Sequence, residues 1–359
     1  SSTVIGSFRS TSGPFFDGSI DQVRIFNTAL TQSQVTTLAR GIATSYSGAA
    51  TNVNFNGHLD FQPDFIWIKN RDNAYNHYLY DSIRGPKNVL ISDSTIQNTV
   101  QTNGLSSFEA NGFFLEGNRL NVNENNSDIV AWNWKAGGTA VTNNDGTIAS
   151  QVSANKDSGF SIVTMNNASV STVGHGLSQA PELIIWKSLT SNTNYWQVLA
   201  QAANGGNGHL GRLALQRSDA FLTVSSVWNN TQPTSTVFTL GASCTGSGVA
   251  YCFHSVAGYS KIGSYTGDGT TSGNIITTGF EPSFLLTKPT GPSGGYWYIL
   301  DNKRSTTNPR NDALFPNDSL AEISSTNYNV DFLSTGFELK NNTIGYNQNN
   351  EKYIYMAFA

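Results

Sequence analysis

Phe61-Gln-Pro-Asp-Phe-Ile-Trp-Ile-Lys69 sets a pattern that returns as Gln179-Ala-Pro-Glu-Leu-Ile-Ile-Trp-Lys187 and Phe280-Glu-Pro-Ser-Phe-Leu-Leu-Thr-Lys288. In each copy, a proline precedes an apolar stretch that ends on lysine. A proline costs least at the entrance of a strand, where its missing N–H is not needed, so each stretch is expected to be a β-strand. The regular spacing predicts an array of duplicated small domains rather than one large catalytic fold.

Further segments of the repeat match as well. An aromatic stretch follows, at 77–81, 195–199 and 296–301, and an apolar stretch closes each repeat, at 130–134, 249–253 and 355–358. These segments are rich in β-branched and aromatic residues, which suit a pleated surface, and turn-forming Gly, Asn, Ser and Asp separate them. We therefore expect an all-β chain of three tandem antiparallel β-sandwich (jelly-roll-like) repeats. Their expected limits are 41–138, 158–258 and 259–359, with a linker or hairpin at 139–157.

The composition narrows the class of protein. Of the 359 residues only 12 % are charged, against about 25 % in ordinary globular proteins, and the net charge is −4. Polarity carried by neutral side chains favours an extracellular or virion surface. No basic stripe predicts nucleic-acid binding, and no apolar run is long enough for a membrane helix. Because residue 1 is Ser rather than Met, we expect a portion of a longer polypeptide.

The first forty residues differ from the repeats. Gly18-Ser-Ile-Asp-Gln-Val-Arg-Ile25 is followed by Asn27-Thr-Ala-Leu30 and by a helix expected at Thr31–Ala39, with Thr31 and Gln34 in a capping-box pattern. This segment resembles the C-terminal end of a laminin-G-like, concanavalin A-like lectin domain. The resemblance implies that 1–40 is the remnant of such a domain. It also raises Ca²⁺ binding near Asp17 and Asp21 as a possibility that the sequence leaves open.

The repeats themselves resemble a second family. Phrases such as Trp132-Asn-Trp-Lys-Ala-Gly-Gly138, Val173-Gly-His-Gly-Leu177 and Gly258-Tyr-Ser-Lys-Ile-Gly-Ser-Tyr-Thr-Gly267 are similar to tandem β-sandwich domains in virion proteins of marine tailed bacteriophages. The resemblance covers about residues 41–359. It implies a virion structural part, either a tail fibre or appendage or a capsid decoration. It carries over no set of functional residues.

Candidate catalytic groups are scattered. The acidic residues considered are mostly singletons in turns: Asp81, Asp145, Asp219, Asp268, Asp312 and Asp318. Asp81 and Asp301 occupy matching ends of the aromatic stretch and are interpreted as strand-end caps, because acid–base hydrolysis needs paired carboxylates across a cleft. The histidines, none of which has metal-ligand spacing, are His58, His77, His175, His209 and His254. We expect no catalytic residue, no metal and no cofactor.

Several other features have simpler interpretations. Gly267–Gly273 resembles a phosphate loop only superficially and is predicted to be a hairpin turn, and Asn144-Asp-Gly is expected to form a type I′ hairpin turn. Cys244 and Cys252 are either two free thiols or a local bridge, and the sequence leaves both open. The tryptophans are expected in cores, with glycan or protein contact as the alternative. Trp67 with Trp186, and Trp196 with Trp297, are taken as aligned pairs.

The sequence thus favours a non-enzymatic virion structural protein on the virion surface. Its expected partners are other virion proteins and copies of itself, with a trimer as one hypothesis and a host-surface glycan as a further ligand. The expected arrangement is a semi-rigid rod or a knobbed cap. The alternative is a secreted or surface bacterial adhesin with carbohydrate-binding modules, and a polysaccharide-degrading tailspike enzyme is the third interpretation.

Overall fold

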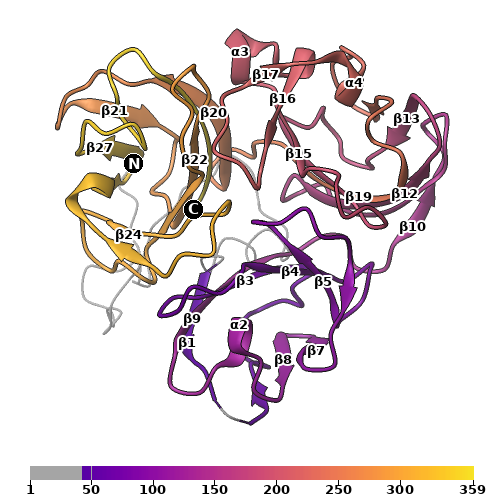
Figure 1. Ribbon diagram of the computed structural model, residues 1–359, viewed down its shortest axis with the longest axis horizontal. Coiled ribbons are helices and arrows are strands. Elements are labelled where there is room, and N and C mark those ends of the chain that lie inside the picture. The colour runs from indigo at the N-terminus through magenta and orange to yellow at the C-terminus, as the bar shows by residue number, and fades with distance from the viewer. Residues whose placement is uncertain (1–42, 50) are drawn as a thin grey trace, which may run out of the picture.

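The three repeats fold into three antiparallel β-sandwich units in the computed structural model, which describes residues 43–49 and 51–359. The all-β sandwich prediction is confirmed. The lectin-like segment, with Asp17, Asp21 and the helix expected at Thr31–Ala39, lies outside the described residues. Figure 1 shows the units as three lobes around a common centre.

The first unit runs from β1 to β9. Its main sheet has the order β1 (Ala43–Ser47), β9 (Asp128–Trp134), β3 (Phe65–Asn70), β4 (Tyr78–Asp81), β5 (Asn88–Ile91), β6 (Thr99–Val100). The facing sheet has the order β2 (Val53–Asn54), β8 (Gly112–Glu116), β7 (Gly104–Glu109), and the short helix α2 (Leu120–Asn123) leads into β9.

The second unit runs from β10 to β19. Its main sheet has the order β10 (Val141–Asn143), β11 (Ser150–Asn155), β12 (Phe160–Asn167), β19 (Gly246–Phe253), β14 (Leu183–Ser188), β15 (Gln197–Ala200), β16 (Gly211–Ala214), β17 (Leu222–Thr223). β13 (Ser171–Gly174) pairs with β18 (Val237–Leu240) on the other side of the unit. Three short helices lie near the sheet end: α3 (Ala203–Gly206), η1 (Gly208–Leu210) and α4 (Ser225–Trp228). The segment 139–157 contributes β10 and β11 to this sheet.

The third unit runs from β20 to β28. Its main sheet has the order β20 (Ser260–Thr266), β28 (Lys352–Phe358), β22 (Phe284–Pro289), β23 (Tyr298–Asp301). The facing sheet has the order β21 (Asn274–Thr277), β27 (Gly336–Leu339), β26 (Val330–Leu333), and β24 (Asp312–Ala313) pairs with β25 (Ile323–Ser324). A 3-10 turn, η2 (Thr326–Tyr328), precedes β26.

Each main sheet is buried on both faces. One face packs against the facing strands of its own unit, through clusters that include Phe113 in the first unit, Phe238 in the second and Phe337 in the third. The opposite face packs against the other two units, in one cluster to which all three contribute. Burying two apolar faces per sheet explains why strands such as β3, β14 and β22 are buried along their whole length.

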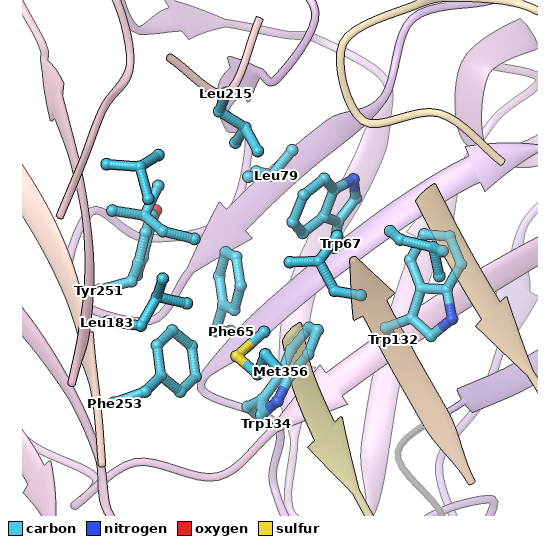
Figure 2. Close-up of a cluster of buried hydrophobic side chains, with 14 of the residues drawn as sticks. Phe65, Trp67, Leu79, Trp132, Trp134, Leu183, Leu215, Tyr251, Phe253 and Met356 are labelled. Carbon is cyan, nitrogen blue, oxygen red and sulfur yellow. The ribbon is translucent and has the colours of Figure 1, made fainter. Parts of the chain in front are cut away.

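The expectation of a rod is therefore wrong. A rod would leave one face of each main sheet in water, whereas here those faces meet one another around the centre of the molecule (Figure 1). Figure 2 shows this central cluster, in which Phe65 and Trp134 of the first unit lie beside Phe253 of the second and Met356 of the third. The hydrophobic effect favours the closed arrangement because it removes three apolar sheet faces from water together.

Two predicted turns differ in the structure. Gly267–Gly273 does not close a hairpin, because it joins β20 to β21, which lie in different sheets. The turn around Asn144 does join a paired hairpin, but Asn143 pairs with Ser150, so the loop is longer than the two residues of a type I′ turn. Gly146 also lacks the positive φ that a type I′ turn needs.

Candidate functional site

Three matching aromatic side chains meet where the units converge. Trp134, Phe253 and Phe358 are the last residues of β9, β19 and β28. Their ring centroids lie 6.4 Å apart for Trp134 and Phe253, 6.0 Å for Trp134 and Phe358, and 6.3 Å for Phe253 and Phe358. Matching positions therefore touch in all three combinations, and the single chain has the contact pattern of a trimer with approximate threefold symmetry.

The lysine that ends each repeated phrase is fully buried. Lys69, Lys187 and Lys288 are each the fifth residue of their strand and have no exposed surface. Their ammonium groups donate to backbone carbonyls: Lys187 Nζ to Thr95 O at 2.7 Å and Asn194 O at 2.9 Å, for example. Burial lowers the pKa of Lys69 and Lys187 to about 8 and that of Lys288 to about 7.

Some of these carbonyls belong to the neighbouring unit. They lie on two segments, 92–98 and 215–221, which follow β5 and β16. Together with the corresponding segment after β24, 314–322, we call these segments arms. Lys187 binds the arm of the first unit through Thr95, and Lys288 binds that of the second through Asp219 O at 2.8 Å. The third arm reaches back to the first unit, where the Glu322 amide donates to Arg71 O at 2.7 Å. Arms thus link the units in a closed cycle.

Tryptophan side chains make matching contacts just before two of these arms begin. Trp196 Nε1 donates to Ile91 O at 2.8 Å, and Trp297 Nε1 donates to Ala214 O at 3.0 Å. Ile91 and Ala214 are the last residues of β5 and β16, so the two contacts correspond between interfaces. A buried indole N–H needs an acceptor, and here the neighbouring unit supplies it.

Two of the three interfaces also hold a buried ion pair. At the third–first interface, Asp301 accepts from Arg304 Nε at 2.6 Å and from Trp132 Nε1 of the first unit at 3.0 Å. At the first–second interface, Asp81 accepts from Arg84 Nε at 2.5 Å and from Tyr251 of the second unit at 2.7 Å. In each case the aspartate ends its strand, and the arginine follows three residues later.

The second–third interface lacks this network. The residues that correspond to the aspartate and the arginine are Ala200 and Ala203, and Met356 takes the place of Trp132 and Tyr251. All three side chains lie in the central apolar cluster. The residue just before the edge strand changes too, because Phe221 stands where the other units have Asn98 and Glu322. One interface in three has therefore exchanged its charged side chains for apolar ones.

A cleft of about 510 Å³ opens at this interface. Its lining comes from both units and comprises Ala202, Ala203, Asn204, Gly205, Ala220, Phe221, Thr223, Ser264, Tyr265, Thr266, Thr290, Gly291, Pro292, Lys352 and Tyr353. The volume lies within the range of about 300–1,000 Å³ for small-molecule sites. Ala203, at the position of the arginine in the other two units, is one of the residues that line this cleft. This cleft is the candidate functional site.

The cleft wall on the third unit is held rigidly. The rings of Tyr265 and Tyr353 stack with centroids 4.8 Å apart and planes 8° apart. Each hydroxyl donates to a backbone carbonyl, Tyr265 to Tyr346 O at 2.9 Å and Tyr353 to Ile344 O at 2.8 Å. On the second unit, the Phe221 ring packs directly over Gly211, where a Cβ atom would lie 2.6 Å from the ring. Gly211 thus makes room for this phenylalanine.

A second cleft, of about 590 Å³, lies at the junction of the first and second units and is more open to solvent. Asp64, Lys135, Lys156 and Asp157 are among its lining residues. Asp64 Oδ2 accepts from the Ala136 amide at 2.9 Å, which anchors the chain as it leaves β9. Asp64 therefore supports the connection between the two units.

The acidic residues singled out in the sequence are not brought together. Asp81 and Asp301 do cap their strand ends, through Arg84 N and Arg304 N, and in addition hold the interfaces. Asp219 pairs with Arg217 on an arm, and Asp268 accepts from the Thr270 amide. The remaining acids keep local roles: Asp145 accepts from Asn143, Asp312 from Ser305 and Ser324, and Asp318 from the Leu320 amide. In the part of the chain that the structure describes, no group of three or more His, Cys, Asp or Glu could hold a metal ion.

Histidines and cysteines are largely internal. His77, His175 and His254 are buried. His77 Nδ1 accepts from Trp67 Nε1 at 3.0 Å, and burial lowers the pKa of His77 well below its usual value. His58 lies exposed in the loop before β3, and His209 lies in η1 next to Gln201. Cys244 and Cys252 are both buried free thiols, and burial raises the pKa of each.

The tryptophans are all buried, which confirms their assignment to cores and leaves no indole face for a sugar. The pairing of Trp67 with Trp186 is wrong, however. Trp67 is the third residue of β3 and lies in the central cluster, whereas Trp186 is the fourth residue of β14 and lies in the core of its own unit. A shift of one residue along a strand moves a side chain to the opposite face.

The sequence carried a signal for the cleft. Asp81 and Arg84 match Asp301 and Arg304, whereas the second repeat has Ala200 and Ala203 at those positions. The loss of a charged pair in one copy of a repeat marks the place where that copy differs in its contacts. Phe221 and Tyr265 could not be found in this way, since they lie in different repeats and only the packing of the units brings them together.

The fold and the cleft define an all-β protein of three sandwich units with one shared core. A family described as a domain of unknown function (DUF7483) matches residues 42–359, so the chain belongs to this family. No curated protein matches the chain. None of the helices in the described residues is long and apolar enough to cross a lipid bilayer.

Proposed function

We propose that this chain is a non-enzymatic structural protein of a bacteriophage virion, either a tail fibre or appendage or a capsid decoration, that presents loops for assembly and host attachment. The observation that carries the proposal is the closed arrangement of three units around one buried core. Its buried charges hold the units together: Lys187 and Lys288 bind neighbouring arms, and Asp81 and Asp301 receive hydrogen bonds across interfaces. The resemblance of 41–359 to virion domains supports the same function.

The proposal includes self-association and neighbouring virion proteins as partners. Appendages and decorations sit on symmetry axes, and a unit with an approximate threefold axis of its own suits attachment at a threefold position or assembly as a trimer. The neutral polar exterior fits a surface on which many copies lie close together, because it keeps exposed sheet edges from sticking to one another.

The candidate cleft favours a second function, that of a secreted or surface adhesin which binds carbohydrate. An adhesin would use the same rigid fold to present the cleft at a cell surface. The two functions differ in where the protein is found.

Immunogold labelling of intact phage particles, with an antibody against residues 43–359, tests the location. We expect label on the particle: along the tail or baseplate for a fibre, and over the head for a decoration. Bare particles, with the protein in the medium or on cells, would overturn the virion proposal and support the adhesin. An antibody against the major head protein of the same phage serves as the positive control.

A further inference from the structure

We infer that the cleft between the second and third units binds a neutral saccharide. This inference deepens the proposed function, since it rests on attachment to a host surface and names the ligand class. It starts from the broken symmetry of the interfaces: two of them hold the Asp81–Arg84 and Asp301–Arg304 ion pairs, and the third has apolar side chains at those positions, beside the cleft.

The lining has the chemistry that a sugar ring requires. A pyranose presents an apolar C–H face and a rim of hydroxyl groups. Phe221 and Tyr265, one from each unit, are half-buried and line the cleft with aromatic surface. Neutral hydrogen-bonding groups surround them, from Asn204, Thr223 and Ser264, all of which are exposed. A few polar groups placed around an aromatic surface are typical of small-ligand sites.

The charge of the lining argues for a neutral ligand. The lining residues include no Asp, Glu or Arg and a single Lys, Lys352, whose Nζ already donates to Thr266 Oγ1 at 2.6 Å. A phosphate or nucleotide site would need several cationic or N–H donors. Phe221 occupies the position that is Asn98 in the first unit and Glu322 in the third. Because those two residues are polar or charged, the aromatic surface is found at this interface and not at the equivalent position of the other two.

The aromatic pair is also prepared for binding. Tyr265 is fixed by stacking and by its hydroxyl, and Phe221 is held over Gly211 and tied through its amide to Thr290 O at 2.9 Å. Side chains that are ordered before binding lose little conformational entropy when a ligand arrives. Ligand contact therefore needs no rearrangement of either unit.

The test is saturation-transfer difference NMR on the whole chain. The probes are the methyl glycosides of glucose, galactose, N-acetylglucosamine and rhamnose, with short oligomers of each at millimolar concentration. At least one probe is expected to give a saturation-transfer signal with the unchanged protein. Thr223→Trp fills the cleft from its exposed rim and should reduce that signal about tenfold or more. Phe221→Asn, which installs the residue of the first unit, should reduce it as well.

Val100→Trp is the matched control. Val100 is the second residue of β6, as Thr223 is of β17, and it is 74 % exposed. This variant should bind like the unchanged protein, and near-ultraviolet circular dichroism should confirm that each variant is folded. Absence of signal from every probe, or a signal that survives Thr223→Trp, would overturn the inference. Because the immunogold result concerns only location, either conclusion can fail without the other.

Discussion

At the scale of single residues, the buried lysines are the most unusual groups in this protein. An ammonium has three donors and no acceptor, and Lys288 satisfies its donors with Asp219 O and Pro289 O at 2.8 Å and a longer contact to Ser218 O at 3.4 Å. In the described residues, no carboxylate lies within ion-pair distance of Lys69, Lys187 or Lys288. Burial without a counter-ion disfavours the charged form, which is why the pKa of each falls to about 7 or 8.

From the lowered pKa values of these lysines we predict that the free energy of unfolding increases with pH above neutrality. Their pKa in the unfolded chain is about 10.4, so between about pH 8 and 10 the unfolded state binds more protons than the folded state. Linkage then raises the free energy of unfolding as pH rises, by up to about 1.4 kcal/mol per pH unit for each titrating lysine. Above that window the trend should reverse, because burial raises the pKa of tyrosines such as Tyr46 and Tyr251.

Urea unfolding between pH 7 and pH 10 measures this dependence. In Lys288→Met the free energy of unfolding should rise less steeply with pH, since one of the titrating groups is gone. The exposed Lys156 is the control position, and Lys156→Met should keep the full slope. A stability that is flat or falls from pH 7.5 to pH 9.5 would contradict the prediction.

At the scale of elements, the arms determine how the units are joined. The third arm closes the cycle through Glu322, whose carboxylate binds Arg71 Nη2 at 2.6 Å and Arg304 Nη1 at 2.5 Å. Both arginines are largely shielded from solvent, and Arg304 is fully buried at its side chain. One carboxylate therefore forms ion pairs with two cations from different units, and it links the third unit to the first electrostatically.

Glu322→Ala should destabilise the protein by about 2 kcal/mol or more, because it leaves two shielded guanidinium groups short of an acceptor. Asp128→Ala is the matched control. Asp128 also pairs with Arg71, at 3.6 Å, but it is 57 % exposed, and such a pair contributes about 1 kcal/mol or less. Hydrogen exchange should also become faster at the Glu322 amide. Equal effects of the two substitutions would contradict this role for the third arm.

At the scale of the whole molecule, the shared core makes the three units interdependent. The Phe65 and Tyr251 rings stack at 4.3 Å across the first–second interface, and the Trp132 and Phe284 rings lie 6.0 Å apart across the third–first interface. A unit removed from the others would expose the inner face of its main sheet to water. Exposed apolar surface of that extent destabilises a small domain and promotes association.

The whole chain from residue 43 to residue 359 is therefore expected to unfold in one cooperative transition by calorimetry. The isolated third unit, 259–359, should lack fixed packing, with a weak near-ultraviolet circular dichroism signal and dye binding. Three separate transitions, or a third unit that is folded and monomeric by itself, would show that each unit is stable alone and that the shared core contributes little.

Much of the local structure could be predicted from the sequence. The strands that follow Pro63, Pro181 and Pro282 are present, and so are the aromatic and closing strands, because alternation and turn residues act over a few neighbours. The face of the sheet to which a side chain points was harder to predict. The predicted alignment of Trp67 with Trp186 was off by one residue, and the two side chains lie on opposite faces of their sheets. The loop 267–273 was also misjudged, since a turn sequence does not say which sheet the next strand joins.

The sequence by itself determined that this chain is a threefold repeat of antiparallel sandwiches. It also shows that the second repeat has Ala200 and Ala203 where the first has Asp81 and Arg84. Only the tertiary structure decided that the repeats close around one core, that Lys187 and Lys288 are buried against neighbouring arms, and that Phe221 and Tyr265 line one cleft. The physical reason is range. Strand formation follows from neighbours along the chain, whereas closure depends on apolar faces that become adjacent only after each sheet has formed.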